Sequence, residues 1–160
     1  MGELRNIEIF NSCVGVVLAK LYAEFPCPVR IDTGRDVASR IEGYEGPKDA
    51  FSDDPACATI CWLINENYIR NDMNGDSSDG PVFIRLLLTS KGLQLLSMPS
   101  SLQKEGNQGK PESLEKYDSI GTKMNQALVS GAMDALRELA KRAVMLAPGL
   151  AQQALFYLRS

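Results

Sequence analysis

Hydrophobic residues recur every three or four positions over residues 4–25, which predicts an amphipathic helix. Pro26 and Pro28 end this pattern, because proline cannot continue the helical hydrogen-bond ladder. Val29 and Ile31 then alternate with polar residues, the period of a short strand. The chain is therefore expected to begin with a helix followed by a strand.

A second helix is expected directly after this strand. Asp32 or Thr33 can cap it by accepting a hydrogen bond from the backbone of its first turn. Its apolar residues have helical spacing: Val37, Ala38 and Ile41. Residues 42–53 are rich in turn formers and predict a loop.

A third helix has a well-marked start and end. Asp54 is a good N-cap, and Pro55 suits the first helical position because its missing N–H is not needed there. The end is expected near Asn67, which tolerates the left-handed conformation of a helix stop.

Two strands and a polar turn are expected next. Tyr68 and Ile69 open the first strand, residues 73–80 form the turn, and the alternation over residues 82–88 predicts the returning strand. Thr89 can cap a short helix that Pro99 ends.

The rest of the chain predicts a linker and a helical tail. We expect a first domain over residues 1–98, a polar linker over 99–111 and one or two amphipathic helices over 112–160. A break is expected at Gly121 or Gly131, and Pro148 is expected to end the main helix.

Composition narrows the chemistry of this 160-residue chain. It contains no histidine, which removes histidine-based triads and histidine metal ligands, and it shows no nucleophile motif, so we expect neither an enzyme nor a cofactor. Its four cysteines lack the paired spacing of zinc sites. They are expected to be unmetallated, buried thiols, with Cys57 and Cys61 at least partly buried.

Charge and hydropathy bear on two properties, nucleic-acid binding and membrane insertion. The net charge is −3, and residues 1–100 carry nine Lys and Arg against fourteen Asp and Glu. This balance disfavours a large nucleic-acid surface in that half of the chain. The apolar run over residues 14–19 is too short to span a bilayer, so a cytoplasmic protein is expected.

Two segments resemble a bacterial winged-helix domain. The first is TICWLINENYIR (Thr59–Arg70) and the second, after a polar loop, is VFIRLLLTSKGLQLL (Val82–Leu96). Small uncharacterised winged-helix proteins of prophages and mobile elements are similar and also carry a helical tail. The resemblance implies a mainly α fold with a small β-wing, that is, a winged helix-turn-helix domain followed by helices.

The resemblance also implies a DNA-binding transcription regulator whose third helix enters the major groove. The candidate DNA contacts are Arg30, Arg35, Arg40, Thr59, Asn65 and Arg70. However, no Lys or Arg occurs from Phe51 to Tyr68, so the third helix lacks the commonest base-reading side chain. The alternative is a winged-helix module that binds a protein and does not bind DNA.

Candidate residues for a protein interface lie on the third helix and in the tail. Trp62 either packs on the first helix or the tail, or stands partly exposed as an anchor for a partner. The tail stripe has small and apolar members at helical spacing: Leu128, Ala132, Ala135 and Leu139. A homodimer is expected, with the helix Val129–Ala147 in its interface.

Overall fold

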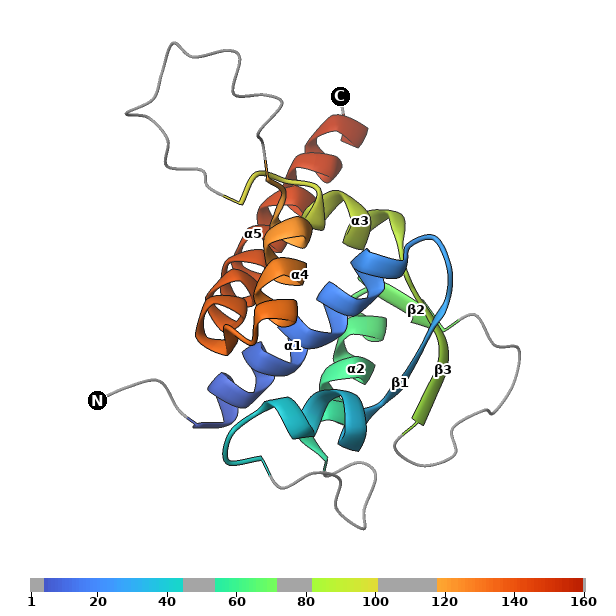
Figure 1. Ribbon diagram of the computed structural model, residues 1–160. Helices are drawn as coiled ribbons and strands as arrows, with labels where there is room; N and C mark the ends of the chain where they lie inside the picture. Colours follow the sequence, from blue (N-terminus) through green and yellow to red (C-terminus); the bar gives the residue numbers. More distant parts are fainter. Residues whose placement is uncertain (1–4, 45–53, 72–81, 101–117, 160) are drawn as a thin grey trace, which may run out of the picture.

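The computed structural model describes residues 5–44, 54–71, 82–100 and 118–159, with side chains described as far as Leu146. These residues are mainly helical and include a small three-stranded antiparallel sheet (Figure 1). In chain order the elements are α1 (Arg5–Glu24), β1 (Val29–Asp32), η1 (Thr33–Val37), η2 (Ala38–Arg40), α2 (Pro55–Asn65), β2 (Ile69–Asn71), β3 (Val82–Leu88), α3 (Ser90–Leu96), α4 (Ile120–Ser130) and α5 (Met133–Arg159).

Strand β3 lies in the middle of the sheet, between β1 and β2. Val29 of β1 faces Leu86, and Ile69 of β2 faces Leu88. The register shifts next to Arg30, where Arg85 of β3 has a left-handed φ of 60°. The predicted strands are confirmed, although β2 begins one residue after Tyr68.

The predicted caps of α2 and α3 are confirmed. The Asp54 carboxylate accepts from the backbone N–H of Cys57 at 3.2 Å, and Thr89 accepts from the N–H of Gly92 at 3.1 Å. Asn67 has a φ of 66° and stands just beyond the end of α2, as its tolerance of this conformation predicts.

The predicted second helix is wrong in its type. Residues 33–40 form a π-helical turn, η1, and a 3-10 turn, η2, instead of an α-helix. Asp32 does cap η1, because its side chain accepts from the N–H groups of Gly34 and Arg35. Asp36 in turn accepts from the backbone N–H of Asp32 at 2.8 Å. This side-chain pairing and the low helix propensity of Gly34 favour turns over a regular helix.

The tail packs on the first helix. Helices α4 and α5 both lie against α1, which also contacts α2 and the sheet (Figure 1). Buried residues of the tail belong to the same hydrophobic core as those of residues 5–98: Met124, Leu128, Leu136, Ala140 and Ala143. The predicted first domain and tail therefore share one core in the described part of the chain.

Gly131, and not Gly121, separates the two tail helices. Gly131 has a left-handed φ of 78°, whereas Gly121 lies within α4. The expected helix end at Pro148 is wrong, because α5 continues to Arg159. A proline removes only one helical hydrogen bond, and the neighbouring Ala, Leu and Gln residues have high helix propensity. Among the described residues, no helix has the length and hydrophobicity needed to cross a membrane.

Candidate functional site

A shallow apolar groove lies between the first half of α1 and helix α2. Its volume is about 280 Å³, and its lining includes Phe10, Ala58 and Trp62. The Trp62 ring meets the Phe10 ring edge-on at a centroid distance of 5.2 Å and stacks with the Tyr68 ring at 6.0 Å. Trp62 is half-buried, so it packs on the first helix and still presents part of its ring to the groove.

The outer face of α2 is uncharged over its whole length. Ala58 and Asn65 are exposed, and none of the residues Pro55–Asn65 is acidic or basic. Thr59 is only 3% exposed, and its hydroxyl donates to the Pro55 carbonyl at 2.7 Å. Thr59 therefore offers little of its side chain to DNA, because its hydroxyl bonds to its own helix.

The four candidate arginines do not line one common groove. All four are exposed. Arg30 and Arg40 line one groove of about 530 Å³, and Arg70 lines a different one of about 500 Å³. Arg35 lines neither. Lys20, which the sequence pattern does not single out, joins Arg30 and Arg40 in the first groove.

The tail residues expected at an interface are only partly available. Ala132 and Ala135 are exposed and Leu139 is half-buried, but Leu128 is 6% exposed and belongs to the core. Leu128 therefore has little surface to offer a partner, and its contact with one stays a prediction. Gly131 has a left-handed φ and separates α4 from α5. Helical spacing counted from the buried residues of α4 therefore does not predict which residues of α5 are buried.

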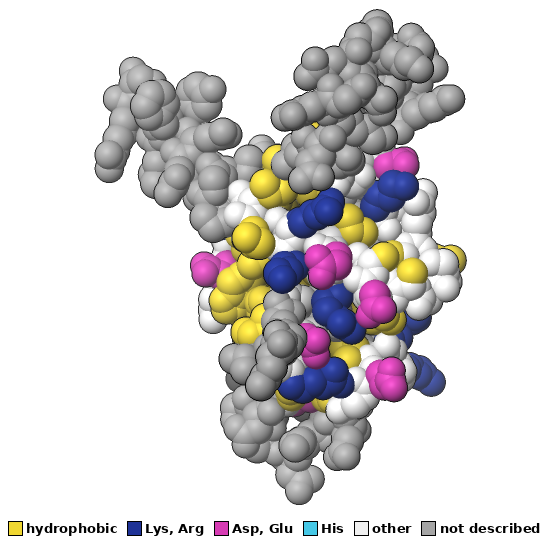
Figure 2. Space-filling model, turned by 90° about the vertical axis from the view of Figure 1, so that its left-hand side faces the viewer, with side chains coloured by type: hydrophobic (Ala, Val, Ile, Leu, Met, Phe, Trp, Pro, Cys, Tyr) yellow, Lys and Arg dark blue, Asp and Glu magenta, His cyan; other side chains and the backbone are white. Residues whose placement is uncertain are grey.

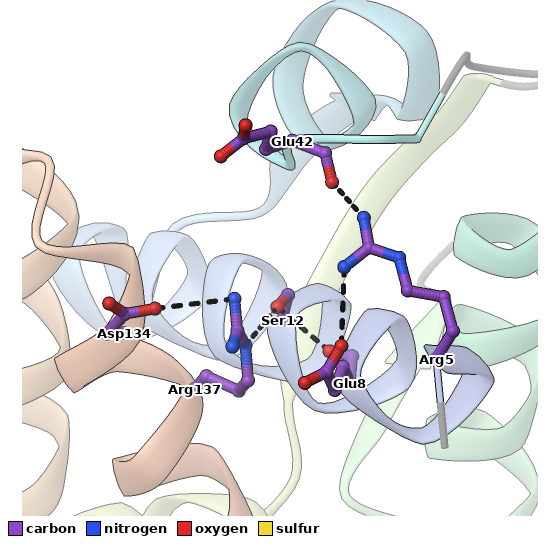
Figure 3. Close-up of polar contacts among 6 residues, drawn as sticks. All are labelled: Arg5, Glu8, Ser12, Glu42, Asp134 and Arg137. Atoms are coloured by element: carbon purple, nitrogen blue, oxygen red, sulfur yellow. Dashed lines mark hydrogen bonds and ion pairs between the residues drawn. The ribbon is translucent and has the colours of Figure 1, made fainter. Parts of the chain in front are cut away.

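A polar network ties α1 to α5 and to the turn after η2 (Figure 3). Arg137 Nε donates to Ser12 Oγ at 3.1 Å, and that hydroxyl donates to the Glu8 carbonyl at 2.9 Å. Arg5 pairs with Glu8 at 3.3 Å and donates to the backbone carbonyl of Glu42. Both arginines are engaged within the chain, so this network holds elements together. On the side that carries α4 and α5, basic and acidic side chains are interspersed (Figure 2).

The cysteines divide into three kinds of environment. Cys13 and Cys57 are buried, Cys61 is half-buried and Cys27 is exposed, so Cys27 departs from the expected burial. Cys27 lies in the turn between α1 and β1 and is exposed there. Burial raises the pKa of both Cys13 and Cys57 from the usual 9.0 to about 12, which keeps these thiols protonated near neutral pH. The described residues contain no cluster of three metal-ligating side chains.

Comparisons of this chain with protein-family models, with curated proteins and with solved structures found no match.

Proposed function

We propose that the protein is a winged-helix module that binds a protein partner through α2. The winged-helix assignment rests on the sequence resemblance and on the order of the elements: a helix, a strand, short helical turns, a helix and two antiparallel strands. The strand near Val29, β1, is the third strand of the sheet, which agrees with that arrangement. The short turns of η1 and η2, in place of a regular second helix, are a departure from it.

The main support for a protein partner is the surface of α2. The helix that a DNA-binding member would place in the major groove has no cation here, and its exposed side borders an apolar groove. DNA binding depends strongly on Lys and Arg contacts with phosphates, and base reading depends most often on Arg. Protein interfaces instead favour a partly buried aromatic residue beside a pocket, as Trp62 is placed.

The groove favours an apolar side chain as the anchor. Its volume of about 280 Å³ suits one or two large aliphatic side chains, such as those on one face of a partner helix. Asn6 lines the groove and offers an amide group for hydrogen bonds with a partner, and Asn65 offers a second, exposed amide on the same helix as Trp62. The partner is therefore expected to present an amphipathic, predominantly uncharged face.

Fluorescence anisotropy with labelled duplex DNA tests the first half of the proposal. At about 0.15 M salt we expect no saturable binding at protein concentrations up to about 1 µM, which is the tight end of the ~1–100 µM range of nonspecific DNA binding. Saturable binding that Asn65→Ala weakens would contradict the proposal and favour the transcription-regulator alternative.

A matched pair of variants tests the second half. A partner is isolated by affinity capture from cells, purified, and titrated against each variant by calorimetry. Ala58→Glu places a charge in the groove and is expected to weaken binding at least about tenfold, because a desolvated carboxylate loses more than about 1.4 kcal/mol. Gln94→Glu adds the same charge at an exposed position of α3 and is expected to leave binding unchanged. Equal affinity of both variants would show that the partner uses another surface.

A further inference from the structure

Three cationic side chains from three separate elements line one concave groove. Lys20 comes from α1, Arg30 from β1 and Arg40 from η2, and α4 closes the groove with Asn125. The volume of about 530 Å³ lies within the usual range of small-molecule pockets. Residues 20, 30 and 40 belong to three separate elements. They come together because α1, the sheet and η2 pack against one another.

These cations are not neutralised within the part of the chain that the structure describes. None of the three side chains has a hydrogen bond or ion pair there, and the groove contains one carboxylate, that of Glu24. Other cations of the molecule do have carboxylate partners: Arg5 with Glu8, Lys123 with Asp118 and Arg137 with Asp134. The groove therefore carries a local excess of positive charge on a chain whose net charge is −3.

Like charges that share a groove repel one another, and an anion bound between them reverses the sign of that interaction. Arginine guanidinium groups bind phosphate oxygens through paired N–H donors, and lysine adds a compact charge. The remaining lining offers apolar contacts from Ala23, Val29 and Val129, which suit the uncharged body of a ligand. The lining of this groove thus includes both cationic and apolar side chains.

We propose that this groove binds a small organic phosphate, a phosphate monoester with an apolar or aromatic body. Its size and concave shape favour a small ligand over duplex DNA. The distribution of charge also favours a small ligand. A small anion in the groove interacts mainly with the groove's own charges, because electrostatic fields are screened beyond about 8 Å at physiological ionic strength. A long polyanion would also meet the acidic remainder of the surface.

The test uses the full-length protein labelled with ¹⁵N and AMP as the probe. In low salt, two-dimensional NMR titration is expected to show saturable shifts at residues 20–30, 40 and 125–129, with a Kd on the order of 1 mM or tighter. Adenosine, which lacks the phosphate, is expected to bind at least about tenfold more weakly, since charge-assisted bonds carry the recognition. Lack of saturation with AMP, or equal binding of adenosine, would overturn the proposal.

Two double variants with the same change of charge locate the site. Arg30→Gln with Arg40→Gln is expected to weaken AMP binding about tenfold or more, because it removes both guanidinium groups of the groove. Arg35→Gln with Arg70→Gln removes two exposed arginines outside it and is expected to retain binding. The spectra themselves report whether each variant is folded. Equal losses in both variants, or tighter binding of a duplex DNA through Arg30 and Arg40, would overturn the proposal. The outcome does not depend on the α2 groove.

Discussion

Gly15 of α1 lies directly against Leu136 of α5. A Cβ added to Gly15 would be 2.7 Å from Cγ of Leu136 and 3.2 Å from its carbonyl oxygen. Both residues belong to the buried interior. The approach of the two helices therefore depends on the missing side chain at position 15, and it fixes where the tail packs.

Gly15→Val is expected to lower the free energy of unfolding by about 1–3 kcal/mol, because the added side chain overpacks this contact. Leu136→Ala is expected to cost about 2–5 kcal/mol by itself. The double variant should be less destabilised than the two costs added together, since the smaller residue 136 makes room for valine. Urea denaturation of the four proteins measures this. Strict additivity would show that the α1–α5 contact is not formed in solution.

Gly92 gives a second steric prediction. A Cβ at this position would overlap the carbonyl oxygen of Tyr68, a backbone atom that also accepts from the N–H of Thr89 at 3.0 Å. Gly92→Ala is expected to cost about 2–3 kcal/mol, because backbone cannot move aside as a side chain can. The control is Gly131→Asn, expected to cost about 1 kcal/mol or less, since nothing lies within 4 Å and Asn tolerates a left-handed φ. Similar losses in thermal melts of both variants would contradict the prediction.

Local signals predicted much of this fold. Asp54, Asn67 and Thr89 act on backbone groups within a few residues, so their roles at helix ends follow from the sequence alone. The same holds for the alternation over residues 82–88, which predicted the strand β3. Gly92, which lies in the second segment of the winged-helix resemblance, also has a physical reason, because the nearby Tyr68 carbonyl leaves no room for a side chain.

Relationships between distant segments could not be predicted in this way. Helical spacing in the tail placed Leu128 and Ala135 in one stripe, but the break at Gly131 shifts the phase, so Leu128 and Leu136 are buried and Ala135 is exposed. The grouping of Lys20 with Arg30 and Arg40 depends on how α1, β1 and η2 pack together. No periodicity of a single segment carries that information.

The cysteines are expected to differ in reactivity. At pH 8, Cys27 should react rapidly with a thiol reagent such as Ellman's reagent because it is exposed. Cys13 and Cys57 should react only after denaturation, since burial both blocks access and raises their pKa to about 12. Mass spectrometry of the labelled peptides distinguishes the sites. Rapid labelling of Cys57 in the folded protein would contradict the placement of α2 against α1.

The same raised pKa predicts a loss of stability in alkali. In the unfolded chain a thiol with a pKa of 9.0 begins to release its proton near pH 9, whereas the folded protein holds the Cys13 proton until about pH 12. The unfolded state therefore binds fewer protons in this window, and the free energy of unfolding falls as pH rises. Cys13→Ala removes one such group, so its stability should fall less between pH 9 and 10.5 in urea titrations. Parallel curves for the wild type and the variant would contradict this.

A homodimer remains a prediction, and the structure changes the residues that test it. Val129 is 80% exposed at the end of α4, and Ala132 and Ala135 are exposed on the chain that follows. Val129→Glu with Ala135→Glu is expected to convert a dimer to a monomer, because each carboxylate would be desolvated in the interface. Leu128→Glu should instead unfold the protein, since Leu128 lies in the core. Light scattering measures the mass of each variant. A wild-type protein that is monomeric at about 100 µM, far above the ~1 µM scale of a −8 kcal/mol interface, would show the prediction to be wrong.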